Sequence, residues 1–159
     1  MNTRATEIEG AMLDVQLSKL RPMMARLRLR YDAMEPILAR SAKFRVAPHN
    51  DQCNAVSLCV TFTRKEEAID FAQQRGVYRL LDNSKHVYTN WEPILSKRTF
   101  NARMTPWEWA QRPINYDVDM CAKTLEILGQ TCHINLGEQY PSFVMRHLAK
   151  RLTPFRSGP

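Results

Sequence analysis

The sequence predicts an α+β fold in which a long helical segment precedes a small antiparallel or mixed sheet covered by helices. Two observations carry this prediction. The N-terminal quarter places apolar side chains at steps of three and four, as an amphipathic helix does. The remainder runs strand–strand–helix–strand and then helix–strand–helix, and this order after long helices is typical of α+β chains. We therefore divide the chain into a helical segment, residues 1–42, and a small α+β domain, residues 43–159.

The N-terminal helix begins at a capping signal and meets a proline midway. Thr6 with Glu9 three residues later has the spacing of a capping box, and Thr3 offers an alternative start. Because Pro22 lacks a backbone N–H, it either opens a second helix or kinks one long helix, so a helical hairpin and a kinked helix are both open. The apolar positions are Ile8, Met12, Val15, Leu20, Met23, Leu27, Tyr31, Met34 and Leu38.

Arginines cluster along the same segment and mostly fall off its apolar stripe. We interpret them as a solvated helix face, and a face that binds a polyanion is the alternative. The residues are Arg21, Arg26, Arg28, Arg30 and Arg40.

Four strands are predicted in the second part of the chain. Residues 55–62 give the strongest pattern, because Val56, Leu58, Val60 and Phe62 alternate with smaller or polar side chains. The other strands span residues 44–46, 77–81 and 131–136.

Three further helices are predicted between and after these strands. Thr63 with Glu66 forms a second capping-box pattern, and Gly76 and Gly129 each follow a helical stretch as a stop signal. Pro141 suits the first turn of the last helix. The helices span residues 64–75, 119–128 and 141–152.

Residues 82–118 have little periodicity and contain all three tryptophans. A loop of this length within a compact domain is typically functional or disordered, and the aromatic residues argue against disorder. We therefore expect a functional or structural role for it.

Composition narrows the classes of function. A net charge of +7 favours anionic partners, but the interleaving of aromatic and basic residues typical of an RNA-binding sheet is absent, so nucleic acid is not favoured. The sequence shows neither a membrane-spanning run nor a signal pattern, which predicts a cytoplasmic protein. Without CxxC spacing the cysteines are expected to be free thiols, and no metal site is predicted. They are Cys53, Cys59, Cys121 and Cys132.

The N-terminal residues also form a recognisable motif. An Asn-x-Arg pair precedes a Glu-Ile helix that runs into Gln-Leu-x-Lys-Leu. The matching residues are Asn2, Arg4, Glu7, Ile8, Ala11, Gln16, Leu17, Lys19 and Leu20. This segment resembles one found in the DegT/DnrJ/EryC1/StrS family of sugar aminotransferases, which use pyridoxal 5'-phosphate (PLP). Residues 56–77 and 121–152 are similar to later parts of the same family.

The resemblance implies the C-terminal domain of a fold-type I PLP enzyme, with residues 1–42 joining a large domain. In the family the large domain supplies the lysine that holds PLP as a Schiff base. No lysine of this chain lies in the corresponding sequence context. We therefore expect the chain to be inactive alone, and to need a lysine-bearing large domain or second subunit.

The resemblance also implies site residues. Asn2 and Arg4 would reach the PLP phosphate across a subunit interface, and a frayed terminus is the alternative. His86, Tyr88 and Trp91 would contact the sugar, and a structural loop pinned by the tryptophan is the alternative. No residue of this chain is predicted to be catalytic.

The sequence thus predicts part of an aminotransferase that transfers an amino group from glutamate or glutamine to a keto- or aldehyde-sugar, commonly nucleotide-linked. The alternative is a non-catalytic basic module that binds a partner protein or a polyanion. Because the helical segment would pack on a missing domain, we expect Met12, Met23 and Met24 to be partly exposed and the chain to form a homo-oligomer.

Overall fold

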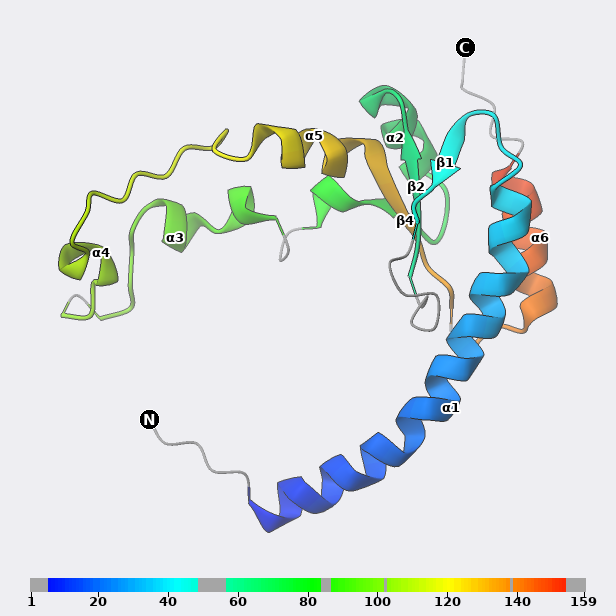
Figure 1. The fold of residues 1–159 in the computed structure, drawn as a ribbon, viewed down its shortest axis with the longest axis horizontal. Helices are drawn as coiled ribbons and strands as arrows, with labels where there is room; N and C mark the ends of the chain where they lie inside the picture. The colour runs from blue at the N-terminus through cyan, green and yellow to red at the C-terminus, as the bar shows by residue number, and fades with distance from the viewer. Residues whose placement is uncertain (1–5, 49–56, 84–86, 102, 138, 154–159) are drawn as a thin grey trace. The chain divides into compact units, whose positions relative to one another are not determined.

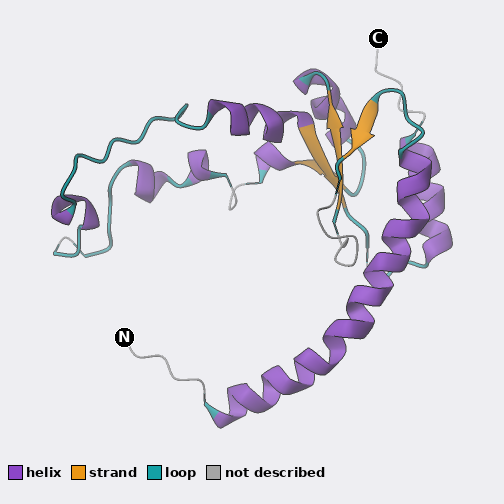
Figure 2. Ribbon diagram, in the orientation of Figure 1, coloured by secondary structure: helices purple, strands orange, loops and turns teal. Residues whose placement is uncertain are grey.

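A computed structural model describes residues 6–48, 57–83, 87–101, 103–137 and 139–153, and it has the predicted α+β fold (Figures 1 and 2). All four strands pair in one antiparallel sheet, in the order β1-β2-β4-β3. The edge strand β3 therefore precedes β4 in the sequence, and β4 lies between β2 and β3 in the sheet. The strands are β1 (Phe44–Val46), β2 (Leu58–Phe62), β3 (Val77–Arg79) and β4 (Thr131–Ile134).

The N-terminal helix is one element, α1 (Glu7–Leu38), rather than a hairpin. The predicted capping box is present, with Thr6 as the N-cap and Glu9 as its reciprocal partner. Pro22 lies inside the helix, which Figure 1 shows as a continuous, bowed ribbon. The kinked-helix alternative therefore describes α1 better than the hairpin, since the missing hydrogen bond at Pro22 bends the helix without ending it.

The chain divides into two compact units, the first comprising Met1–Val60 with Ile134–Pro159 and the second Thr61–His133. In the first unit α6 (Ser142–Leu152) packs along the C-terminal part of α1. Ala47 N donates to Cys59 O at 2.9 Å beside β1. The buried apolar side chains of this unit come from α1, β1, β2, α6 and the end of β4. They are Tyr31, Met34, Leu38, Phe44, Leu58, Val60, Ile134, Leu136, Met145, Ala149 and Leu152.

The second unit packs α2 (Lys65–Ala72) against α5 (Ala122–Gln130) and β3. The rings of Phe62 and Phe71 lie 5.1 Å apart at the centre of this unit. The predicted alternation along β2 is confirmed where the structure describes it, because Leu58, Val60 and Phe62 are all buried. The alternation of apolar residues thus predicted which face of β2 packs in the core.

Short helices occupy the tryptophan-rich segment that was predicted as a loop. They are the 3-10 helix η3 (Tyr88–Asn90) and the single-turn helices α3 (Glu92–Leu95) and α4 (Pro106–Trp109). Another 3-10 helix, η2 (Leu80–Asp82), takes the end of the strand predicted for residues 77–81, which stops at Arg79. Pro93 and Pro106 each lie in the first turn of their helix. Backbone N–H groups there have no partner within the helix, so a proline loses no helical hydrogen bond.

Several predicted helix boundaries differ from the structure: the helix predicted for residues 64–75 ends at Ala72, and the one predicted for residues 119–128 begins at Ala122. The N-cap of α2 is Arg64, without a side-chain cap bond, so Thr63 and Glu66 do not form a capping box. Gly129 does not stop α5, which continues through it to Gln130 and passes directly into β4. The left-handed backbone that makes glycine a helix stop is absent at Gly129, and the described glycines that adopt it are Gly76 and Gly137.

No described helix combines the length and the apolar character that crossing a bilayer requires.

Candidate functional site

The two residues predicted to bind the PLP phosphate, Asn2 and Arg4, lie outside the described residues. The adjacent start of α1 is described. Thr6 N donates to Glu9 Oε2 at 2.7 Å, and Glu9 N donates to Thr6 Oγ1 at 3.2 Å. The cap thus uses donors that a helix end would otherwise offer to an anion.

Negative charge further disfavours an anion at this helix end. Glu7 and Glu9 both lie in the first turn of α1. The pKa of Glu9 is below its ordinary value because the backbone N–H and then the hydroxyl of Thr6 bond to its carboxylate. A phosphate beside this terminus would therefore depend on side chains such as Arg4 rather than on the helix itself.

Tyr88, predicted to contact a sugar, makes its hydrogen bonds inside the protein. Its hydroxyl donates to Val118 O at 2.6 Å and accepts from Cys121 N at 3.2 Å. One phenol therefore joins η3 to the residues just before α5, some thirty positions along the chain. These contacts give Tyr88 a positioning role in the tryptophan-rich segment and leave its hydroxyl little capacity for a ligand.

Trp91 follows Tyr88 by three residues and remains accessible. Its backbone N–H donates to Tyr88 O at 2.9 Å, and its carbonyl accepts from Ile94 N at 2.9 Å, so its main chain is fixed between η3 and α3. Its side chain is 44% exposed. Trp91 is the C-cap of η3, directly after the turn that Tyr88 begins. His86, the third residue of this predicted set, lies outside the described residues.

The rest of this segment is held by local contacts and exposes much aromatic surface. Trp107 Nε1 donates to the hydroxyl of Tyr116 at 3.1 Å. Phe100 and Trp109 are both largely exposed. This arrangement offers rings for stacking against an apolar or sugar-ring face.

The described lysines do not form a Schiff-base site. A lysine that holds PLP is desolvated, which lowers its pKa and makes the amine nucleophilic. All of the described lysines are instead exposed on the surface: Lys19, Lys43, Lys65, Lys97, Lys123 and Lys150. Lys85 lies outside the described residues.

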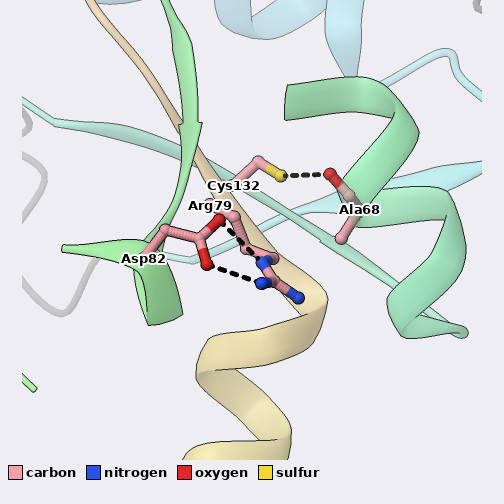
Figure 3. A network of polar contacts seen from close by, with 4 residues as sticks. All are labelled: Ala68, Arg79, Asp82 and Cys132. Carbon is pink, nitrogen blue, oxygen red and sulfur yellow. Dashed lines mark hydrogen bonds and ion pairs between the residues drawn. The ribbon is translucent and has the colours of Figure 1, made fainter. Parts of the chain in front are cut away.

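The second unit also holds a small polar network (Figure 3). Arg79 makes two bonds to the carboxylate of Asp82, and this contact raises the pKa of the arginine. The buried thiol of Cys132 donates to Ala68 O at 3.3 Å and so ties β4 to α2. We interpret the contacts as structural, because the thiol of Cys132 is buried and the charges of Arg79 and Asp82 pair with each other.

The two described histidines of β4 and α6 have different surroundings. His133 is half-buried beside Tyr78, at 4.7 Å between ring centroids, but its Nδ1 bonds to none of the described residues. Burial lowers the pKa of His133, so the ring is neutral at physiological pH. His147 is exposed on α6.

Sequence reasoning missed the surface of α6 on which His147 lies. A shallow depression there is lined by Phe143, Val144, Arg146, His147 and Lys150. Their spacing of three and four residues, which places them on one helix face, was the available signal. Among the described residues, no cluster of three or more metal-ligating side chains was found.

Comparisons with known proteins add no relative: no protein-family model matches the chain, and no curated protein matches it.

Proposed function

We propose that this chain is the C-terminal domain of a PLP-dependent sugar aminotransferase and that it is inactive alone. With a lysine-bearing large domain or second subunit, it would help transfer an amino group from glutamate or glutamine to a keto- or aldehyde-sugar, commonly nucleotide-linked. The proposed location is the cytoplasm.

The proposal depends on one observation: the N-terminal half of α1 has exposed apolar side chains. Met12 is exposed and Met23 and Met24 are half-buried, as the sequence predicted. The helix is nevertheless capped and continuous with a packed half. A helix with this many exposed apolar side chains is suited to an interface, and in the proposed enzyme this segment joins and contacts the large domain.

The architecture and the lysines give further support. An antiparallel sheet with flanking helices fits the expected small domain. The described lysines are all exposed, which is consistent with a partner that supplies the Schiff-base lysine.

The proposed roles of the site residues come from the family resemblance and, for Tyr88 and Trp91, also from their surroundings. Asn2 and Arg4 would bind the PLP phosphate through their side chains. Trp91 would present its ring to the sugar, with His86 nearby in sequence, while Tyr88 would hold the segment in place through Val118 and Cys121. PLP would supply the electron sink for transamination when bound to the lysine-bearing part.

The test combines this chain with the polypeptide encoded directly upstream of Met1, which is expected to contain the Schiff-base lysine. The mixture should bind PLP, develop its aldimine absorbance band and transaminate with glutamate or glutamine. Each polypeptide alone is the control. A folded mixture that binds no more PLP than the upstream polypeptide alone contradicts the proposal.

A basic binding module remains the second candidate, favoured by the exposed Arg146, His147 and Lys150 on α6. This candidate predicts affinity for a polyanion such as heparin that falls steeply as salt rises. The variant R146E/K150E should abolish such binding, whereas the aminotransferase proposal predicts no such affinity.

A further inference from the structure

Helix α1 carries a heptad repeat that extends beyond its packed half. Large apolar residues follow one another at alternating steps of four and three, the spacing of the a and d positions of a coiled coil. They are Leu13, Leu17, Leu20, Met24, Leu27, Tyr31, Met34 and Leu38. We call this row the heptad seam.

The seam is covered at only one end. Tyr31, Met34 and Leu38 are buried in the part of α1 on which α6 packs. Leu17, in contrast, is 64% exposed, and Leu13 and Leu20 are exposed as well. In Figure 1, α6 lies beside the C-terminal end of α1 and stops well short of its N-terminal half. The uncovered seam is thus preorganised for another helix.

We propose that the uncovered seam pairs with the same seam of a second copy of this chain, with the two helices antiparallel. Antiparallel a and d positions form mixed layers. Leu17 would pack against Leu20 of the second copy, and Leu13 against Met24 of the second copy. Because the contact is two-fold symmetric, each layer occurs twice.

Charges beside the seam select the antiparallel orientation. Asp14 and Arg21 both occupy e positions of the heptad and are exposed. In the antiparallel pair, e positions face e positions, so Asp14 lies near Arg21 of the second copy, and the reverse pair forms by symmetry. A parallel pair would instead bring Glu9, at a g position, near Asp14 of the second copy and place two negative charges together.

The expected association is weak and depends on concentration. From Leu13 to Met24 the seam spans about 17 Å at the usual helical rise. An interface this short is smaller than a standard stable one, so a dissociation constant on the order of micromolar is expected. This pairing goes beyond the proposed aminotransferase role, and a lysine-bearing domain that covers α1 would compete with it.

Sedimentation equilibrium of the full chain tests the pairing with a matched pair of variants. Leu17 lies on the seam and is 64% exposed, whereas Leu29 lies at an f position away from it and is 62% exposed. We expect L17E to weaken dimerisation at least tenfold and L29E to change it less than twofold. A wild-type chain that stays monomeric to millimolar concentration, or equal effects of L17E and L29E, would overturn the proposal.

Charge reversal tests the orientation. D14R and R21D should each weaken the dimer severalfold, because each places two like charges opposite each other. The double variant D14R/R21D should restore the wild-type dissociation constant, since the pairs form again with exchanged signs. Additive weakening in the double variant would overturn the antiparallel register. If the chain and the upstream polypeptide together bind no PLP, the dimerisation measurements would not change. The two proposals can therefore be contradicted independently.

Discussion

The two halves of α1 share an apolar repeat but have different surroundings. Both carry the heptad seam, and each contains at least one arginine. The C-terminal half is anchored by buried side chains and by Arg30, whose Nε donates to Tyr140 O at 2.7 Å beside α6. The N-terminal half is held by its cap and its own backbone bonds. The comparison teaches that periodicity defines a helical face, while only the packed structure shows whether that face has a partner.

The same substitution in the two halves should give the largest contrast. L38A removes a side chain that is 0% exposed and leaves a cavity, so it should lower the free energy of unfolding by about 2–5 kcal/mol. L17A truncates a side chain in the exposed half and should change it by less than about 0.5 kcal/mol. Urea unfolding at a concentration where the chain is monomeric measures both. Similar losses in the two variants would mean that Leu17 is covered within one chain.

The arginines should show a smaller contrast of the same kind. Arg30 is 8% exposed and donates to two carbonyls, Tyr140 O and Arg26 O. R30M keeps most of the stem but leaves these carbonyls without their donor, so it should cost about 1–3 kcal/mol. R21M, in the exposed half, should cost less than about 0.5 kcal/mol. The same urea titration compares them, and equal stability of the two variants would contradict the anchoring role of Arg30.

Loss of the cap should have the smallest and most local effect. T6A removes both side-chain bonds to Glu9 and should destabilise the first turns of α1 by about 0.5–2 kcal/mol. Because the large apolar side chains of these first turns are exposed, the helix should fray without lowering global stability. Reduced helical circular dichroism with an unchanged urea midpoint is the expected result, and S18A, near the middle of α1, is the control. A shifted midpoint would show that the first turns are coupled to the core.

Lowering the pH should weaken the start of α1, as T6A does. The pKa of Glu9 is lowered in the folded helix, so its contribution is complete above the ordinary value of 4.5 and is lost as the pH falls through the lowered pKa. The wild-type helix should therefore fray below pH 4.5, and T6A should fray less steeply over the same range.

The elements predicted well from sequence are those whose signals are local. The Thr6–Glu9 cap and the alternation along β2 are confirmed because both depend on nearby residues. Gly129 misled the prediction because it is buried inside α5 and lacks the left-handed backbone of a helix stop. Gly137, which does adopt positive φ against the ring of Tyr140, has no periodic pattern around it to reveal it.

The candidate site was less predictable for a similar reason. Tyr88 looked available for a sugar, but its hydroxyl contacts Val118 and Cys121, which are distant in sequence. Only tertiary structure brings these groups together. Trp91 kept the exposure expected of a binding residue, and the roles of Asn2, Arg4 and His86 stay predictions.

Amide hydrogen exchange along α1, measured at low and high protein concentration, tests most directly whether its N-terminal half is an interface. We expect residues 31–38 to exchange slowly at both concentrations, because they belong to the core. Residues 10–24 should exchange rapidly in the dilute sample and become protected as the concentration rises. Exchange in residues 10–24 that is unaffected by concentration would contradict the proposed pairing.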